Sequence, residues 1–399
     1  MLSNGVKLMA SRAINKLGDV LYDYGNSSWI ASMGILGQRM LGVYQIAELL
    51  VSICLNPFGG VLADRFKRRK ILLWTDGLCA LLCFSLSFIT DKKLMLYGLI
   101  LANMLLAISN AFSSPAYRAY TPEVLDKKEL VSYNANLESI VQVIKVSSPI
   151  LGLVIYQQLG IRLTLFIDGL TFLLSFFFLY QIKHEDYAGV DQEHKPLNTK
   201  SILKDIWEGL RYIMAEKEIF FLLLMAALVN IFLAILTYLL PFAPRLFGQA
   251  GAYATILSLS ALGAILGASL AKKVPNTMIA LLWMLGLSGL GIIVMALSPL
   301  LHLPVYASYS GALLYSLFET IFNIHFFSQV QQRVANEYMG RVFSTIYTIA
   351  ILLMPLGTLS MTIIKESVSA YSFIFVGSAV FTLAMVGLVY VKLTFKHSK

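Results

Sequence analysis

The sequence predicts an all-α membrane protein with twelve transmembrane helices, six in each half of the chain. Of its 399 residues, 58% are hydrophobic and only 13% are charged, whereas about a quarter of the residues in a typical soluble domain are charged. Apolar runs of about 20 residues, the length that crosses a bilayer as a helix, recur along nearly the whole chain. One membrane-embedded unit explains this pattern better than two or three soluble domains do.

The predicted spans divide equally between the two halves, and their ends are defined to about three residues. In the first half they lie at roughly 13–36, 41–62, 70–89, 94–114, 136–158 and 162–182. In the second half they lie at roughly 218–241, 250–271, 278–298, 305–328, 342–363 and 370–391. Six spans in each half are typical of a transporter that arose by duplication.

The longest polar stretch separates the two halves. We therefore expect a six-helix bundle at 1–182, a linker at 183–217 and a second six-helix bundle at 218–399. Within the linker, apolar residues from Ile202 to Ile213 recur at helical spacing opposite charged residues. This pattern predicts an amphipathic helix on the membrane surface, and a simple tether between the halves is the alternative.

Basic residues are distributed unevenly between the two sides of the membrane. With a cytoplasmic N-terminus, most of them fall in inside connections and at the two ends. The opposite side then holds only Arg39, Lys92, Lys93, Arg162, Arg245 and Lys365. The positive-inside rule therefore predicts a multi-pass protein of the cell membrane with both termini and the linker in the cytoplasm. It also explains the net charge of +9 without nucleic-acid binding.

The connection between the second and third predicted spans carries the most specific motif. It reads Gly60-Val61-Leu62-Ala63-Asp64-Arg65-Phe66-Lys67-Arg68-Arg69-Lys70. This motif resembles the G-x-L-A-D-R-x-G-R-K signature of the major facilitator superfamily, with Lys67 where the family usually has its second glycine. An ordinary positive-inside loop would explain the bases but not the order of the residues.

Further stretches resemble the macrolide-efflux and siderophore-exporter branch of that superfamily. They are Leu17-Gly18-Asp19, 114–122, Phe166-Ile167-Asp168, 208–212 and 340–344. The resemblance implies the major facilitator fold, with two pseudo-symmetric six-helix bundles and a site between them, and drug export coupled to proton entry by alternating access. Two departures from the family weaken the coupling prediction: the antiporter signature in the fifth span keeps only Pro149 and Gly152, and the fourth span contains no Arg or Lys.

The resemblance also implies a conformational latch at the inner ends of the bundles. In this interpretation Asp64 holds the ends together in one state, through Arg118 or through the helix that follows Gly340 and Arg341. Its negative charge would favour a helix N-terminus. The predicted latch residues are Gly60, Asp64, Arg65, Arg68, Arg118 and Arg341.

Charged residues within the spans are the candidates for the transport pathway, because a charge at the bilayer centre costs at least about 2.5–3.5 kcal/mol. Asp23 lies about 15 Å along the first span, near the midplane. Asp19 can pair with Lys16, whereas Asp23 needs a partner on another span or water. A structural hydrogen bond from Asp23 to a neighbouring helix is the alternative to a place in the cavity.

Each half also contributes one acid in a polar stripe at helical spacing. Glu48 is centred among Gln45, Ser52 and Asn56, and Glu319 lies between Ser316 and Asn323. Desolvation disfavours the charged form of a carboxyl group, so protons and substrate could compete at these acids. A permanently hydrogen-bonded structural acid is the alternative for each.

The fifth span carries Glu138 and Lys145 on one face. Lys145 is either the counter-ion of Asp23 or Glu48, which we favour because intramembrane charges usually pair, or a contact for an anionic substrate. His325 either relays protons or is simply hydrogen-bonded, and a lone histidine is more often the latter. The predicted pathway is Asp23, Glu48, Lys145 and Glu319, with Asp19, Glu138, Asn323 and His325 as secondary candidates.

The resemblance implies a secondary active exporter of a small amphiphilic compound, such as a drug, antibiotic or secondary metabolite. The sequence does not determine the oligomeric state, and a monomer is favoured. A lipophilic cation is favoured because it can replace a departing proton at little electrostatic cost. Uptake, lipid flipping and a non-transport sensor are the alternatives. The sequence has no phosphate-binding glycine loop, H-E-x-x-H pair or G-x-S-x-G elbow, so we expect no enzymatic activity, cofactor or metal.

Overall fold

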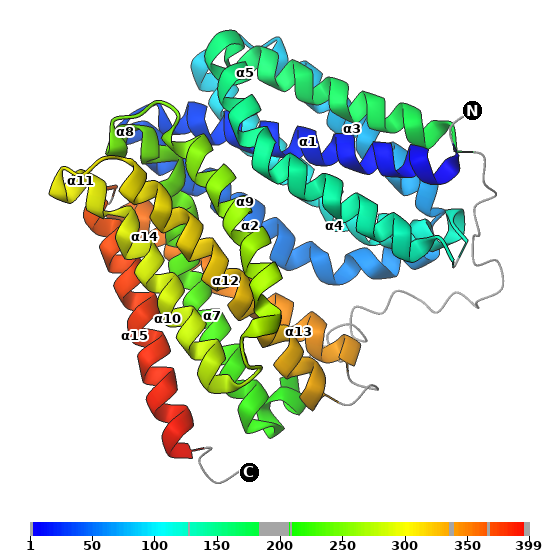
Figure 1. Cartoon of the computed structure of the whole chain (residues 1–399). Coiled ribbons are helices and arrows are strands. Elements are labelled where there is room, and N and C mark those ends of the chain that lie inside the picture. Colours follow the sequence, from blue (N-terminus) through cyan, green and yellow to red (C-terminus); the bar gives the residue numbers. More distant parts are fainter. Residues whose placement is uncertain are drawn as a thin grey trace. The chain divides into compact units, whose positions relative to one another are not determined.

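The computed structural model describes residues 3–126, 128–182, 207, 210–334, 339–364 and 368–394 (Figure 1). The chain divides into two compact units, Met1–Ile202 and Leu203–Lys399, here called unit 1 and unit 2. Each unit is helical throughout its regular structure, so the predicted all-α architecture is confirmed. The division into bundle, linker and bundle at 182 and 218 stays a prediction.

Unit 1 contains long helices joined by short turns. Gly160, with φ of 70°, interrupts the last of them and separates the two helices that the sequence predicts there. Glycine adopts this left-handed conformation without steric cost, so a single residue makes the turn. The elements are α1 (Asn4–Ala31), α2 (Ile35–Arg65), α3 (Arg68–Ser87), α4 (Lys92–Val124) and α5 (Leu130–Tyr180).

Close approach between helices shapes the interior of unit 1. α1 packs mainly against α5, and α2 against α4. A Cβ atom at Gly18 would lie 2.1 Å from Oγ1 of Thr171 and 2.5 Å from Oδ1 of Asp168. Only glycine therefore lets α1 come this close to the second part of α5.

Unit 2 combines long helices with short helical segments at their ends. Pro355 lies in the first turn of α14 and separates it from α13, because proline lacks the backbone N–H that would continue the preceding helix. The elements are α7 (Lys217–Leu239), η1 (Leu240–Phe242), α8 (Ala243–Phe247), α9 (Ala252–Leu270), η2 (Ala271–Lys273), α10 (Met278–Met295), α11 (Leu297–Leu301), α12 (Tyr306–Arg333), α13 (Met339–Leu352), α14 (Met354–Ile363) and α15 (Ala370–Thr394).

Glycines on α9 bring its backbone against that of α12. A Cβ atom at Gly263 would lie 2.3 Å from the carbonyl oxygen of Leu313, and one at Gly267 would lie 2.4 Å from that of Leu317. Small residues permit such packing between membrane helices. α10 contacts both α12 and α15, and these contacts form the interior of unit 2.

The part of the chain that the structure describes contains seven helices long and apolar enough to cross a membrane. α1, α2 and α12 are also long, but they carry the predicted acids and other polar side chains and are not among the seven. Each predicted span overlaps a helix, and the count of twelve stays a prediction. The seven segments are Arg68–Ser87, Lys92–Val124, Ser132–Tyr180, Lys217–Phe247, Ala252–Lys273, Met278–Met295 and Ala370–Thr394.

The end of the predicted linker packs into unit 2. Residues 210–215 are helical, and Ile213 is fully buried in a core cluster with Ile219 and Leu222. Ile213 therefore contacts protein, and the amphipathic helix on the membrane surface stays a prediction. Residues 202–206, where the predicted amphipathic pattern begins, lie outside the described residues.

Candidate functional site

α1, α2 and α4 bring the predicted acids of unit 1 into one polar cluster. The side-chain amide of Asn103 donates to Oε2 of Glu48 at 3.2 Å and to the carbonyl oxygen of Tyr44 at 3.1 Å. The amide of Asn26 donates to the Tyr44 hydroxyl at 3.5 Å. Asp23 is close enough to Glu48 for an electrostatic interaction. Acids that are 25 positions apart in the sequence thus share one site.

Accessibility distinguishes the two acids from their neighbours. Asp23 and Glu48 are exposed, whereas Tyr22 and Tyr44 are each only 3% exposed. The Tyr22 hydroxyl and the side-chain oxygen of Asn26 are buried without a hydrogen-bond partner among the described residues. Because lipid excludes charge, exposed carboxyl groups at this depth favour a polar space that water or a ligand can enter.

Asp19, the other predicted acid of α1, forms an ion pair with Lys16 of the same helix. The Lys16 ammonium lies 3.5 Å from Oδ2 of Asp19, and both side chains are partly buried. Asp23 forms no ion pair within the described part of the chain. It is therefore the acid of α1 whose charge is available to a substrate or a proton.

The residues predicted on α5 do not complete this cluster. Lys145 is exposed and forms no ion pair with Asp23 or Glu48. Glu138 is exposed and accepts a hydrogen bond from Gln142 of the same helix at 2.6 Å. The described partner of Glu48 is the uncharged amide of Asn103, and the role of Lys145 as a counter-ion stays a prediction.

Sequence analysis missed Asp76, a buried acid of α3. Its side chain is 4% exposed, and its carboxylate accepts hydrogen bonds from Nδ2 of Asn15 at 3.0 Å and Oγ of Ser175 at 2.5 Å. Ser175 is in turn 2.8 Å from the hydroxyl of Ser11. The sequence signal was weak, since Asp76 lies beside Thr75 only six residues into the predicted span 70–89, where a charge can be expected to reach water.

A second buried acid, Asp168, lies in the second part of α5. It is completely buried, and it accepts hydrogen bonds from Sγ of Cys83 and Oγ1 of Thr171, both at 3.2 Å. Sequence analysis named Asp168 only as part of the family resemblance. The donors come from α3 and from the helix itself, so the structure was needed to identify them.

A small polar cavity adjoins Asp76 inside unit 1. Its volume is about 20 Å³, which is room for about one water molecule. α1 contributes Asn15 and Asp19 to its wall, and α4 contributes Ser109 and Asn110. The interior of unit 1 therefore contains an acid, a polar lining and space for water between the helices.

In unit 2 the predicted acid forms a hydrogen bond within its own helix. The amide of Asn323 donates to Oε1 of Glu319 one turn earlier on α12, and both side chains are partly buried. The local pairing of Glu319 matches its predicted polar stripe. A joint action of Glu319 with Glu48 stays a prediction.

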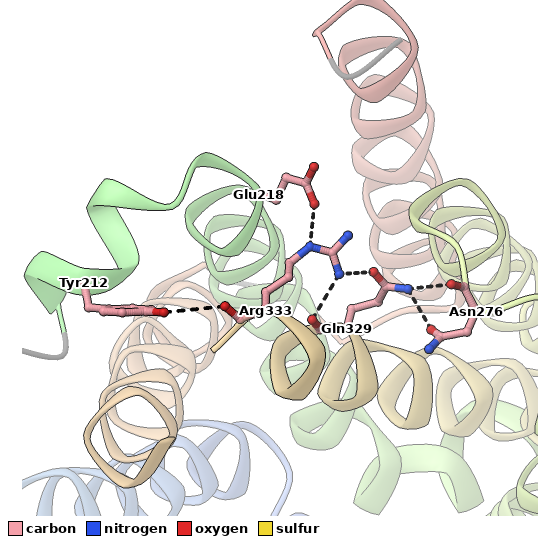
Figure 2. A network of polar contacts seen from close by, with 5 residues as sticks. All are labelled: Tyr212, Glu218, Asn276, Gln329 and Arg333. Atoms are coloured by element: carbon pink, nitrogen blue, oxygen red, sulfur yellow. Dashed lines mark hydrogen bonds and ion pairs between the residues drawn. The ribbon is translucent and has the colours of Figure 1, made fainter. Parts of the chain in front are cut away.

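Figure 2 shows a polar network of Asn276, Gln329, Arg333 and Glu218 at one end of α12. A further contact to Asn276 comes from His325. Its Nδ1 lies 3.2 Å from Oδ1 of Asn276, and that oxygen also accepts a hydrogen bond from Nε2 of Gln329 at 2.8 Å. Gln329 accepts from Arg333, whose Nε lies 2.5 Å from Oε2 of Glu218. The network fastens α12 to the start of α7 and to the connection before α10.

The basic residues near the predicted latch connect helix ends within unit 1. Arg68 forms an ion pair with Glu123 and donates to the carbonyl oxygen of Ala119 at 3.2 Å, which links the start of α3 to the last turns of α4. Arg118 is exposed. Gly60 lies within α2. The side chains of Asp64, Arg65 and Arg341 lie outside what the structure describes, so the Asp64 latch stays a prediction.

The family of the chain follows from comparison with known proteins. The sequence model of the Major Facilitator Superfamily matches residues 23–358. The chain belongs to the major facilitator superfamily. It is 25% identical over 382 residues to BacE of Bacillus subtilis, a protein named as a bacilysin exporter, covering 92% of this chain and 90% of that protein. It is 24% identical over 350 residues to macrolide efflux protein A of Enterococcus faecalis, covering 83% and 99%.

Solved structures share the fold of this superfamily member. A bacterial homologue of the iron transporter ferroportin in its inward-facing state has a TM-score of 0.73 at 15% identity, with 97% of each chain covered. A D-xylose-proton symporter has a TM-score of 0.71 at 13% identity, with 96% of each chain covered. The protein is thus a multi-pass membrane transporter of small molecules, and its relatives confirm the predicted similarity to the efflux branch.

Proposed function

We propose that this transporter exports a small amphiphilic compound, preferably a lipophilic cation, in exchange for protons by alternating access. The observation that carries the proposal is the pair Asp23 and Glu48, two exposed acids in one polar cluster. Relatives named as exporters of bacilysin and macrolides support the direction of transport.

Glu48 and Asp23 differ in their hydrogen-bond donors, and we assign them different roles on this basis. Glu48 receives a hydrogen bond from Asn103, and an amide N–H stabilises a carboxylate. Asp23 has no such donor among the described residues. Two nearby carboxylates repel each other when both are ionised. Asp23 is therefore the proton carrier, and Glu48 provides a fixed negative charge that attracts a cation.

Competition between the proton and the substrate then couples their movements. A cation beside Glu48 favours loss of the proton from Asp23, and protonation of Asp23 weakens binding of the cation. Exchange of one monovalent cation for one proton is electroneutral, so the pH gradient alone drives it. One pH unit corresponds to about 1.4 kcal/mol and supports about a tenfold substrate gradient.

Proton-driven flux in liposomes tests this function. Purified protein would be reconstituted with a fluorescent lipophilic cation, and the pH gradient would be imposed in either direction. We expect the cation to move against the proton flow, at a rate that collapsing the membrane potential leaves unchanged. Co-movement with protons would instead indicate uptake, headgroup translocation without cation flux would indicate lipid flipping, and no flux of any substrate would favour a sensor.

The orientation is part of the same proposal. We propose a protein of the cell membrane with both termini and the linker on the cytoplasmic side, supported by the distribution of basic residues. Single cysteines would replace residues of the 183–217 linker in a variant that lacks Cys54, Cys79 and Cys83. A membrane-impermeant reagent should label them only after the cells are opened. Labelling in intact cells would overturn the orientation.

A further inference from the structure

An open groove runs along the surface of unit 2 between α7 and α15. Its volume is about 540 Å³, within the range of about 300–1,000 Å³ that is typical of small-molecule sites. Phe220 and Leu224 line it from α7, and Leu383, Val386 and Tyr390 line it from α15. Val386 is 60% exposed and Leu224 45%. The groove is therefore an apolar surface that something other than this unit covers.

The groove has the length of one bilayer leaflet. On α7 it extends from Lys217 to Leu228, and on α15 from Thr394 to Leu383. Each stretch rises about 16 Å at 1.5 Å per residue, and half of a hydrocarbon core of about 30 Å is about 15 Å. Both helices are apolar enough to span a membrane. The groove thus matches an acyl chain of a single leaflet.

One end of the groove is basic. Lys217 lines it at the first residue of α7, beside Met214. Arg211 is exposed and lies three residues before Met214 in the helical residues 210–215, so the two side chains share a face. Neither base forms an ion pair with the described residues, whereas the neighbouring acid Glu218 is neutralised by Arg333.

We propose that this groove binds one anionic phospholipid, with an acyl chain along α7 and α15 and the phosphate against Lys217 and Arg211. Charge complementarity selects the headgroup, because the exposed bases at this end, Lys217, Arg211 and Lys392, outnumber the one exposed acid described there, Glu216. Shape selects the tail, because the apolar wall extends for about the length of one leaflet. On the proposed orientation of the chain, the lipid belongs to the cytoplasmic leaflet.

Lipid titration of the full-length protein, followed by native mass spectrometry, tests the headgroup. Phosphatidylglycerol and phosphatidylcholine with identical acyl chains would be added to the protein in detergent. We expect one phosphatidylglycerol to bind in preference to phosphatidylcholine, and Lys217→Gln to weaken its binding about fivefold. Lys392→Gln is the matched control, since Lys392 is exposed near the same end of α15 but does not line the groove.

A second pair of variants tests the tail. Val386→Trp should fill the groove and remove binding of both lipids, and Val389→Trp should leave binding unchanged because Val389 is 57% exposed outside the groove. Thermal unfolding would establish that each variant is folded. Equal binding of the two lipids, or wild-type phosphatidylglycerol binding by Lys217→Gln or Val386→Trp, would overturn the proposal. The proposal would also be overturned if the wild type and Val389→Trp form dimers and Val386→Trp does not. The occupant of the groove would then be a second copy of the chain.

Discussion

Unit 1 and unit 2 differ in what they bury. Unit 1 encloses the acids Asp76 and Asp168, each with two side-chain donors, and leaves Asp23 and Glu48 exposed on neighbouring helices. The buried polar side chains described in unit 2 are serine, threonine, glutamine and histidine, without an acid. The difference supports the proposal that proton handling belongs to unit 1.

The two units also differ in how closely their helices pack. In unit 2 a Cβ atom at Gly289 would lie 2.7 Å from the carbonyl oxygen of Gly377, and Gly263 is in similarly tight contact with the backbone of α12. In unit 1 the tight contact at Gly18 is made with the side chains of Thr171 and Asp168. Close backbone packing gives unit 2 a rigid interior, whereas hydrogen-bonded acids occupy the interior of unit 1.

The largest effect should come from removing an acid of unit 1 rather than that of unit 2. Asp23→Asn or Glu48→Gln should lower proton-driven transport by about tenfold or more, equivalent to at least about 1.4 kcal/mol. Glu319→Gln should lower it by less, because no second acid among the described residues lies close to Glu319, as Asp23 does to Glu48. Initial rates in liposomes would rank the three variants. A greater loss for Glu319→Gln would place the coupling in unit 2.

Backbone packing in unit 2 should be the next most sensitive feature. Gly263→Ala should destabilise the protein by about 3 kcal/mol, the upper end for overpacking, because the added Cβ meets a backbone carbonyl oxygen at 2.3 Å. Gly286→Ala is the control, since its Cβ meets the flexible end of Met385 at 3.0 Å. Equal unfolding temperatures for the two variants in detergent would contradict rigid packing at Gly263.

The hydrogen bonds of the buried acids in unit 1 should have an intermediate effect. Ser175→Ala removes a donor from Asp76 and a partner from Ser11, and it should cost about 2 kcal/mol. Ser139→Ala should change stability by less than about 0.5 kcal/mol because its hydroxyl is exposed and bonds to its own helix. Thermal unfolding measures both variants. A negligible effect of Ser175→Ala would mean that water replaces its hydroxyl.

The smallest effect should come from the ion pairs that join helix ends in both units. Arg333 with Glu218 in unit 2 and Arg68 with Glu123 in unit 1 are partly exposed. Each pair should contribute about 1 kcal/mol or less. A double-mutant cycle with Arg333→Gln and Glu218→Gln would measure the coupling energy, and the same cycle at Arg68 and Glu123 would compare the units. A coupling energy well above about 1 kcal/mol in one unit alone would show that its ion pair contributes more to joining its helix ends than the pair in the other unit.

The helices were predictable because the apolar runs that cross a membrane are local in sequence. The spans at 136–158 and 162–182 correspond to the two parts of α5, and the break at Gly160 falls between them. The major facilitator motif at 60–70 is likewise one continuous stretch of sequence, so it could be recognised without a structure. The hydrogen-bond and ion-pair partners of the acids were not predictable, because they depend on which helices face each other. For this reason the sequence identified Glu48 but not Asn103, and it assigned Lys145 a partner that the structure does not show.

The buried acid Asp76 was missed by sequence analysis for a different reason. Asp76 lies in a short polar patch beside Thr75 near the start of a span, where a charge can be expected to reach water. The structure encloses it because Asn15 and Ser175, from α1 and α5, supply hydrogen bonds over it. Depth along one helix does not reveal the lateral packing of other helices, so the sequence could not separate Asp76 from an interfacial residue.

The central claim is that Asp23 releases the proton that the substrate displaces. Substrate would be added to purified wild-type protein in weakly buffered detergent solution, and proton release would be followed with a pH indicator. Asp19→Asn serves as the control because Asp19 is paired with Lys16. The account predicts release by the wild type and Asp19→Asn, and none by Asp23→Asn, although Asp23→Asn still binds substrate. Wild-type release by Asp23→Asn would contradict it and transfer the role to another acid.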